Sequence, residues 1–102
     1  MRIILTALLI VPTALPAQSA TGRIVDELRG GPVPGASVEL RFVSGVRVAR
    51  TITSPTGLFL FRALAPGEYA VRAAGIGYSP RLSGVFRVGD GDVSLGTISL
   101  SP

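Results

Sequence analysis

The stretch that decides the fold is Gly22–Tyr78, which contains GRIVD (22–26), PVPGASVEL (32–40), TSPTGLFLF (53–61), LAPGEYAVR (64–72) and GIGY (75–78). Apolar residues at every second position are typical of strands with one buried face, and Pro and Gly between such runs are typical of turns. Almost no part of this stretch has the three-to-four-residue apolar spacing of an amphipathic helix. The stretch therefore predicts a series of short β-strands.

Working outward from this stretch, we predict seven strands. They cover about 21–28, 36–42, 46–53, 58–62, 68–73, a segment that ends near 88, and 93–100. The second strand is the clearest, and its inward-facing residues are expected to be Ala36, Val38, Leu40 and Phe42. Short strands with turns about every eight to twelve residues predict an antiparallel β-sandwich, because a parallel sheet would need crossover helices.

The strand at 46–53 is expected to place Val46, Val48 and Ile52 on its inner face, with Arg50 interrupting near an edge. In the strand at 58–62, the two phenylalanines share one face. Leu60 lies on the opposite face and indicates that this face is partly covered too.

Three local features follow from turn chemistry. Ser54–Gly57 has Pro at its second and Gly at its fourth position, which favours a type I turn. Gly89–Asp92 indicates a hairpin turn, because Gly and Asp tolerate positive φ. In the last strand the first two apolar residues are out of phase with the last two, so we predict a β-bulge at Gly96–Thr97 that brings all four to one face.

These segments together resemble the carboxypeptidase regulatory-like domain, a small β-sandwich of the transthyretin (prealbumin) type with Greek-key connections. The resemblance covers nearly the whole chain after residue 17. The residues that form the structural motif are Gly35, Gly57, Phe59, Phe61, Pro66, Gly67, Tyr69, Gly77 and Tyr78. The resemblance implies an accessory module, with partners such as catalytic carboxypeptidase domains, TonB-dependent outer-membrane receptors or surface-assembled proteins.

The first 17 residues have the pattern of a secretory signal peptide, with Arg2, the apolar run Ile3–Val11 and then small residues. We expect cleavage after Ala17, with a cut as late as Ala20 as the alternative. Residues 18–102 then form one domain. The apolar run is shorter than the roughly 20 residues that span a membrane, and an uncleaved anchor helix is the weaker alternative. We therefore expect a bacterial protein exported to the periplasm, the outer membrane or the medium.

The residue types that are absent exclude most catalytic chemistry. The chain has no His, Cys, Lys, Asn or Trp. Catalytic triads, thiol nucleophiles, Schiff-base lysines and zinc sites are therefore ruled out within this chain. The histidines of transthyretin-like hydroxyisourate hydrolases and the Lys–Asn crosslinks of collagen-adhesin B-type domains have no counterpart. We expect no catalytic residue, no cofactor and no metal site.

Four acidic residues are the remaining candidates for acid–base or Ca²⁺ chemistry, namely Asp26, Glu27, Asp90 and Asp92. Gly-Asp-Gly-Asp offers fewer close oxygen ligands than a Ca²⁺ loop normally does, and such a run is ordinary turn chemistry. A carboxylate at Asp26 can cap a turn at the end of the first strand. The turn interpretation is favoured in each case.

The chain carries ten arginines and six acidic residues, and removal of Arg2 with the signal peptide leaves a formal net charge of +3. Nucleic-acid sites usually concentrate positive charge in one stripe, whereas these arginines are spread over every segment. We therefore expect no nucleic-acid partner and interpret the arginines as solvated strand faces. Attraction to anionic surface polysaccharide or lipid headgroups stays open.

The aromatic residues divide into two groups. Those in alternating strands are expected in the core and are Phe42, Phe59, Phe61, Tyr69 and Phe86. Tyr78 follows Gly77 at a corner, where the resemblance implies a tyrosine that packs against the edge of the sandwich. The alternative is a ligand contact in which Tyr78 stacks on a sugar.

The function that these observations favour is an exported, non-catalytic accessory or interaction module that makes protein–protein contacts in the cell envelope. Sheet edges offer a place where an extended partner segment adds as a strand. The alternatives are a carbohydrate-binding module and the N-terminal module of a TonB-dependent receptor. An enzyme built on a carboxylate pair is the least favoured interpretation.

Overall fold

The computed structural model describes residues 18–102, so the predicted signal peptide lies outside the described residues. Among the described residues all regular elements are strands. They are β1 (Ala20–Asp26), β2 (Ser37–Phe42), β3 (Arg47–Ile52), β4 (Leu58–Phe61), β5 (Gly67–Ala74), β6 (Arg81–Leu82), β7 (Phe86–Val88) and β8 (Val93–Leu100).

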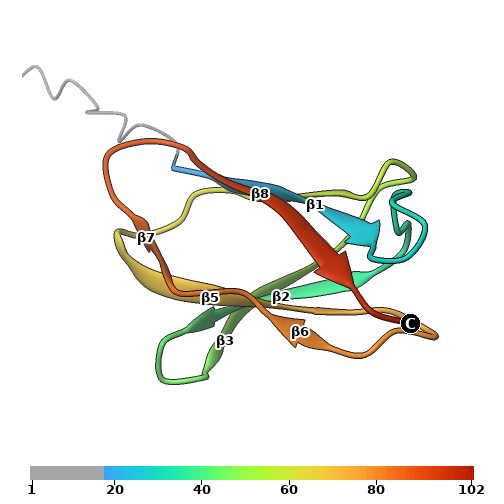
Figure 1. Ribbon diagram of the computed structural model, residues 1–102. Coiled ribbons are helices and arrows are strands. Elements are labelled where there is room, and N and C mark those ends of the chain that lie inside the picture. The colour runs from blue at the N-terminus through green and yellow to red at the C-terminus, as the bar shows by residue number, and fades with distance from the viewer. Residues whose placement is uncertain (1–17) are drawn as a thin grey trace, which may run out of the picture.

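The strands form two sheets that face each other as a sandwich (Figure 1). One sheet has the order β4-β1-β8, and the other has the order β3-β2-β5-β6. β7 also pairs with β5, at residues 67–69, whereas β6 pairs with residues 72–73. The predicted all-β sandwich is confirmed. One pair departs from the antiparallel expectation, because β1 and β8 are parallel. The chain reaches β8 from β7 in the opposite sheet, so no hairpin constrains the direction in which β8 runs beside β1.

Residues 18–102 form eight strands and not seven, because the segment predicted to end near Val88 is divided into β6 and β7. Ser83 lies between them, and its hydroxyl accepts the Val71 N–H at 2.9 Å. The Ser83 N–H in turn donates to the Val71 carbonyl oxygen at 2.8 Å. The side chain of Ser83 thus replaces a backbone acceptor opposite β5, and the regular ladder is interrupted there.

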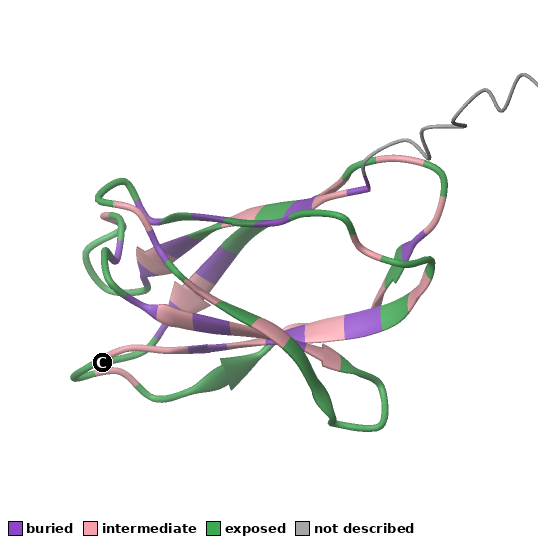
Figure 2. Cartoon of the chain, turned by 180° about the vertical axis from the view of Figure 1, so that it is seen from behind, coloured by how far each residue is buried: buried purple, intermediate pink, exposed green. Residues whose placement is uncertain are grey.

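The core lies between the two inner faces, and Figure 2 shows buried residues alternating with exposed ones along the strands. Its largest fully buried side chains are Tyr69, Ile24, Leu40, Leu100, Val38, Val71 and Val88. Full burial of one such aliphatic side chain stabilises a fold by about 1.5–3 kcal/mol. The alternation in β2 and β5 therefore accounts for how the sheets hold together without disulfides.

The prediction for the inner face of β3 is wrong. Val46, Val48 and Ile52 are 60%, 39% and 50% exposed. β3 pairs with β2 so that Ala49 lies opposite the buried Leu40. Opposed residues share a face, so this register turns Ala49 inward and turns Ile52, opposite Ser37, outward. The register shift between Leu40 and Arg41 then leaves Val48 without a partner in β2 and returns Arg47 to the outer face opposite Arg41. Val46 lies before the strand begins.

The predicted bulge in β8 is confirmed. Thr21 of β1 pairs with Ser94, and Arg23 pairs with Thr97, so β8 contains one extra residue between these pairs. Gly96 lies in this bulge with φ of 66°, a conformation that glycine adopts without a steric penalty. The bulge places Ile98 in the core and lets Leu95 pack against it.

Two of the four connections between the sheets were predicted as turns. In the first, the Gly57 N–H donates to the Ser54 carbonyl oxygen at 2.9 Å, as the predicted turn requires. Gly57 has φ of 78°, and a Cβ at this position would lie 2.5 Å from the Ile24 carbonyl oxygen. The second is Gly89–Asp92, which joins β7 to β8. The predicted hairpin is wrong here, because β7 pairs with β5 and β8 pairs with β1.

Candidate functional site

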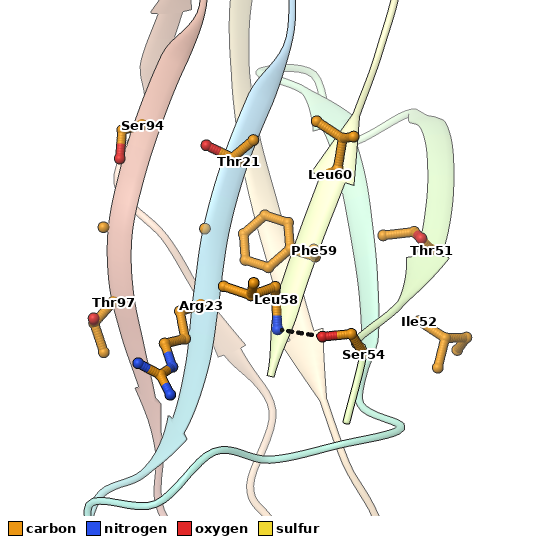
Figure 3. Close-up of a pocket in the computed structure, with 12 residues that line it drawn as sticks. Thr21, Arg23, Thr51, Ile52, Ser54, Leu58, Phe59, Leu60, Ser94 and Thr97 are labelled. Atoms are coloured by element: carbon orange, nitrogen blue, oxygen red, sulfur yellow. Dashed lines mark hydrogen bonds between the residues drawn. The ribbon is translucent and has the colours of Figure 1, made fainter. Parts of the chain in front are cut away.

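A groove of about 670 Å³ lies along the three-stranded sheet and the neighbouring end of β3. Figure 3 shows its side chains, which come from β8, β1 and β4 and from the segment that ends β3 and turns towards β4. These elements belong to different sheets, and β3 and β4 lie in contact where the two sheets meet at this margin. The groove therefore depends on the sandwich and not on any single strand.

The groove is bordered by strand edges that carry no neighbouring strand among residues 18–102. β4 pairs with β1 alone, and β3 pairs with β2 alone. Ser54 closes one end of β4, since its hydroxyl accepts the Leu58 N–H at 3.1 Å and its own N–H donates to the Leu58 carbonyl oxygen at 2.9 Å. Beyond Leu58 the outer edge of β4 stays open to an added strand.

The lining of the groove is apolar at its centre and polar at its rim. Ile52, Leu58 and Leu60 are half-exposed there, at 50%, 53% and 38%. Of the described residues that line it, Arg23 is the one that carries charge, and its Nε donates to the Thr56 carbonyl oxygen at 3.2 Å. This lining offers contact area and hydrogen-bonding hydroxyls, and it contains no carboxylate that acts as a general acid or base.

A second polar feature is the contact between Asp26 and Tyr78. The Tyr78 hydroxyl donates to Asp26 Oδ2 at 2.7 Å, and Asp26 Oδ1 accepts the N–H groups of Leu28 at 2.8 Å and Arg29 at 3.0 Å. The hydrogen bond from Tyr78, together with the backbone donors, lowers the pKa of Asp26 below its usual value. The same hydrogen bond, together with burial, raises the pKa of Tyr78.

This contact ties the corner after β5 to the end of β1 in the other sheet. Tyr78 also borders a smaller hollow of about 360 Å³, which Leu28 and Ile76 help to line. The hollow lies apart from the groove, and the two share no lining residue. Contact of Tyr78 with a glycan stays a prediction.

The other predicted motif residues lie in the core or in turns. Phe59 and Phe61 are buried, with ring centroids 6.0 Å apart in an edge-to-face arrangement. Phe59 also lines the groove. Gly35 and Gly77 occupy loop positions with φ of 69° and 83°, while Pro66 precedes Gly67, where β5 begins.

Tyr69 lies at the centre of a row of aromatic rings on the inner face of the larger sheet. Its ring is stacked between Phe42, at 5.5 Å, and Phe86, at 6.2 Å, and its hydroxyl donates to the Ala65 carbonyl oxygen at 2.6 Å. Phe42, predicted in the core, is 45% exposed because it ends β2 where the sandwich opens. The row is therefore covered at its centre and exposed at Phe42.

The acidic candidates are spread over the molecule. Asp92 Oδ1 accepts the Ser19 N–H at 3.1 Å and its hydroxyl at 2.8 Å, and Glu27 accepts a hydrogen bond from Ser101. Within residues 18–102, no group of three or more acidic side chains is placed to hold a metal ion. The aspartates at 26 and 92 thus fasten chain segments to one another.

Sequence reasoning missed the groove residues Ile52 and Leu58. A usable signal was present, because β4 is apolar on both faces in Leu58–Phe61 and Leu60 already indicated cover on its outer side. The sequence did not show that β3 lies beside β4, since these strands belong to different sheets.

Solved structures with the same fold include proteins of different kinds. A variant of BcpA, the major pilin subunit of Bacillus cereus, matches with a TM-score of 0.69 and 12% identity over 85% of this chain and 30% of the pilin. The 5-hydroxyisourate hydrolase of Klebsiella pneumoniae matches with a TM-score of 0.63 and 20% identity over 83% of this chain and 87% of the hydrolase.

A proposed carbohydrate-binding protein from Bacteroides uniformis matches with a TM-score of 0.64 and 22% identity over 83% of this chain and 41% of that protein. At these identities the matches show the fold alone. This chain spans less than a third of the pilin and less than half of the Bacteroides protein.

Among curated proteins, none matches this chain. Within residues 18–102, no helix is long and apolar enough to cross a membrane. The family model of the carboxypeptidase regulatory-like domain matches residues 19–101, which include every strand of both sheets. The chain therefore belongs to the carboxypeptidase regulatory-like domain family.

Proposed function

We propose that this domain is a non-catalytic interaction module of the cell envelope that binds an extended polypeptide segment in the groove beside β4. The observation that carries the proposal is the groove itself, which combines an open strand edge with half-exposed apolar side chains. Backbone groups at such an edge hydrogen-bond to an added strand, and apolar pockets select alternate side chains of the added segment.

The chemistry of the groove suits binding and not turnover. Leu58 and Leu60 give an apolar centre, while Thr21, Ser94 and Thr97 supply hydroxyl and backbone groups at the rim. An extended segment with apolar residues at every second position would set them against the two leucines and leave polar residues over the rim.

The non-catalytic assignment is supported by the residue types of the whole chain. The Klebsiella hydrolase shares the fold, but this chain has no His, Cys or Lys with which to build a comparable acid–base site. Fold similarity does not carry an activity to a chain that lacks the reacting side chains.

The envelope location rests on the predicted signal peptide in the first 17 residues. Within the described part, Gln18 and Ser19 already belong to the fold, because their carbonyl oxygens accept the N–H groups of Leu64 at 3.0 Å and Val93 at 2.8 Å. Cleavage after Ala17 would leave both contacts intact. A pilin subunit among the solved structures is consistent with a role in a surface assembly.

Carbohydrate binding is the second candidate, because a proposed carbohydrate-binding protein has the same fold. The Tyr78 hydroxyl is engaged by Asp26, and the aromatic row is buried at Tyr69, so the aromatic surface open to a sugar is small. A role as the N-terminal module of a TonB-dependent receptor stays an alternative from the family resemblance. The domain would then present the same groove as part of a longer chain.

Site-specific photo-crosslinking tests the proposal. A photoreactive residue is placed at Leu60 in the full-length protein, which is expressed in cells, and crosslinked envelope proteins are identified by mass spectrometry. We expect a discrete protein product from Leu60, because its side chain lies in the groove and is 38% exposed. Leu58→Asp in the same protein should remove the product by placing a charge in the apolar centre.

The matched control carries the photoreactive residue at Val85, which is 60% exposed and lies outside the groove. The proposal fails if the two positions give the same products, or if Leu60 gives none. Glycan-array binding that is lost in Leu58→Asp, without a protein product, would support the carbohydrate alternative instead.

A further inference from the structure

The outer face of the larger sheet gathers five of the nine arginines in residues 18–102. Pairing across the strands places Arg50 and Arg72 opposite Glu39, Arg47 opposite Arg41, and Arg87 opposite Glu68. Residues directly opposite one another lie on the same face of a sheet. The intervening residues of β2 and β5, which include Leu40 and Val71, are buried. This set therefore forms one solvent-facing surface, which we call the arginine face.

The arginine face carries the whole net charge of the described chain. Its five arginines and two glutamates give a formal charge of +3, and the remaining four arginines and four acidic residues of 18–102 cancel. The even spacing of arginines along the sequence thus becomes an uneven distribution in space. A surface of one sign attracts an oppositely charged partner over roughly 8–10 Å at physiological salt.

The two glutamates leave much of this charge free. Glu39 accepts a hydrogen bond from Arg41 at 2.7 Å, and its carboxylate lies 3.8 Å from the Arg47 guanidinium. These two arginines, together with Arg72, lower the pKa of Glu39. One carboxylate therefore serves three guanidinium groups. Arg50 donates to the neutral Ser37 hydroxyl at 2.8 Å, so its charge is not neutralised by that contact.

An apolar tip adjoins the arginine face. The hairpin between β2 and β3 carries Val43 and Val46, which are 59% and 60% exposed. Arg41 precedes this tip, Arg47 follows it, and Val48 lies 39% exposed beside them. Figure 2 shows the hairpin turn exposed beyond the end of the sheet. Apolar side chains at a protruding tip, flanked by arginines, match a surface that is anionic outside and apolar beneath.

We propose that the arginine face and the Val43–Val46 tip dock this domain on a bilayer surface that contains anionic lipids. Guanidinium groups bind lipid phosphates through paired N–H donors, while the valines enter the boundary between headgroups and acyl chains. A soluble polyanion would engage the arginines and leave the tip in water, so the tip is what favours a lipid surface. No residue of the arginine face or of the tip lines the groove beside β4, although Arg50 is followed by Thr51 and Ile52, which do. The proposal does not rest on the groove.

Vesicle co-sedimentation tests the proposal with the full-length protein and variants that all share residues 1–17. The readout is the ratio of affinities for phosphatidylcholine vesicles that contain phosphatidylglycerol and for vesicles of phosphatidylcholine alone. We expect Arg47→Gln/Arg50→Gln/Arg87→Gln to lower this ratio by roughly tenfold to a hundredfold, since each arginine near an anionic surface contributes about a factor of five. Added salt should weaken binding of the parent protein.

A matched triple elsewhere controls for net charge. Arg29→Gln/Arg62→Gln/Arg81→Gln removes the same number of exposed arginines from outside the arginine face and the groove and should change the ratio less than about threefold. An equal fall in the affinity ratio for both triple variants would overturn the proposal. Equal affinity of the parent protein for both kinds of vesicle would also overturn it.

The tip is tested separately. Val43→Ser/Val46→Ser should weaken binding to phosphatidylglycerol vesicles several-fold, because apolar area buried in the interface contributes to the affinity. Leu28→Ser/Val85→Ser is the control, since these residues are 79% and 60% exposed elsewhere. If the tip variant binds vesicles as the parent does, and a soluble acidic polysaccharide competes fully, the ligand is a polyanion and the lipid assignment is wrong.

Discussion

The outer faces of the two sheets differ in charge although their inner faces share one core. On the smaller sheet, the outward side chains include Leu58, Leu60, Thr21 and a single arginine, Arg23. On the larger sheet, cross-strand neighbours bring together five arginines and two glutamates. Both sheets follow the same alternation of inward and outward residues. The difference shows that packing constrains one face of each strand and leaves the other free for surface chemistry.

The largest expected effect comes from comparing inward and outward leucines. Leu40→Ala should lower the free energy of unfolding by about 2–5 kcal/mol, because Leu40 is fully buried and truncation leaves a cavity. Leu60→Ala should cost less than about 1 kcal/mol, because that side chain is half-exposed. Urea denaturation of both variants measures this difference. Similar losses would mean that the outer face of β4 is part of the core and would remove the distinction between the faces.

A smaller effect is expected at the turn where the chain leaves the larger sheet for the smaller one. Gly57→Ala should lower the free energy of unfolding by about 1–3 kcal/mol, since it requires positive φ and would set a Cβ 2.5 Å from the Ile24 carbonyl oxygen. Thermal and urea denaturation measure the loss.

Gly31→Ala is the control for that substitution, because its φ is not positive and a Cβ there meets nothing within 4 Å. It should change the free energy of unfolding by about 0.5 kcal/mol or less. Equal stability of the two variants would show that the backbone of the turn at Gly57 can shift to accommodate a Cβ.

The smallest effect is expected where Tyr78 ties the larger sheet to Asp26 of the smaller one. The pKa of Asp26 is lower in the folded protein than its unfolded value of 3.8. The ionised carboxylate therefore stabilises the fold at pH values above 3.8, and this stabilisation is lost as the pH falls through the folded pKa. The pKa of Tyr78 is raised above its unfolded value of 10.0. The stabilisation by its protonated hydroxyl is therefore present below pH 10.0 and is lost as the pH rises through the folded pKa. The difference in Tm between the parent protein and Tyr78→Phe should therefore be widest between these limits.

Tyr69→Phe is the matched control for the acid limb. The Tyr69 hydroxyl donates to the Ala65 carbonyl oxygen, which does not titrate in acid. The difference in Tm between the Tyr69→Phe variant and the parent protein should therefore not narrow below pH 3.8, whereas the difference for Tyr78→Phe should. The same narrowing in both variants would attribute the acid dependence to other carboxyl groups, such as Glu39, and not to the Asp26–Tyr78 contact.

Features that depend on neighbours along the chain could be predicted from the sequence. The phase change between Leu95 and Ile98 required one extra residue, and Gly96 provides it in the bulge. The alternation around Phe59 and Phe61 predicted two buried rings, and both are buried. Such features need only the two-residue period of a strand and the preferences of Gly and Pro.

Features that depend on strand register could not be predicted. Val46, Val48 and Ile52 look like an inner face because they are the largest apolar residues of the predicted strand at 46–53, yet pairing of β3 with β2 turns Ala49 inward. A shift of one residue in the pairing of two strands exchanges the inner and outer faces of a strand, and the local sequence does not determine that pairing. The same limit applies to the groove, where Ile52 and Leu58 approach from different sheets.

The sequence by itself determined that this chain is all-β, where most of its turns lie, and that it lacks the side chains for nucleophilic or metal chemistry. These conclusions follow from residue type and local periodicity, which are present in any conformation of the chain. The tertiary structure alone decided which outward residues meet. It brought Arg47, Arg72 and Arg87 onto one face and placed β3 beside β4 to border a groove, because cross-strand neighbours are set by topology and register and not by distance along the chain.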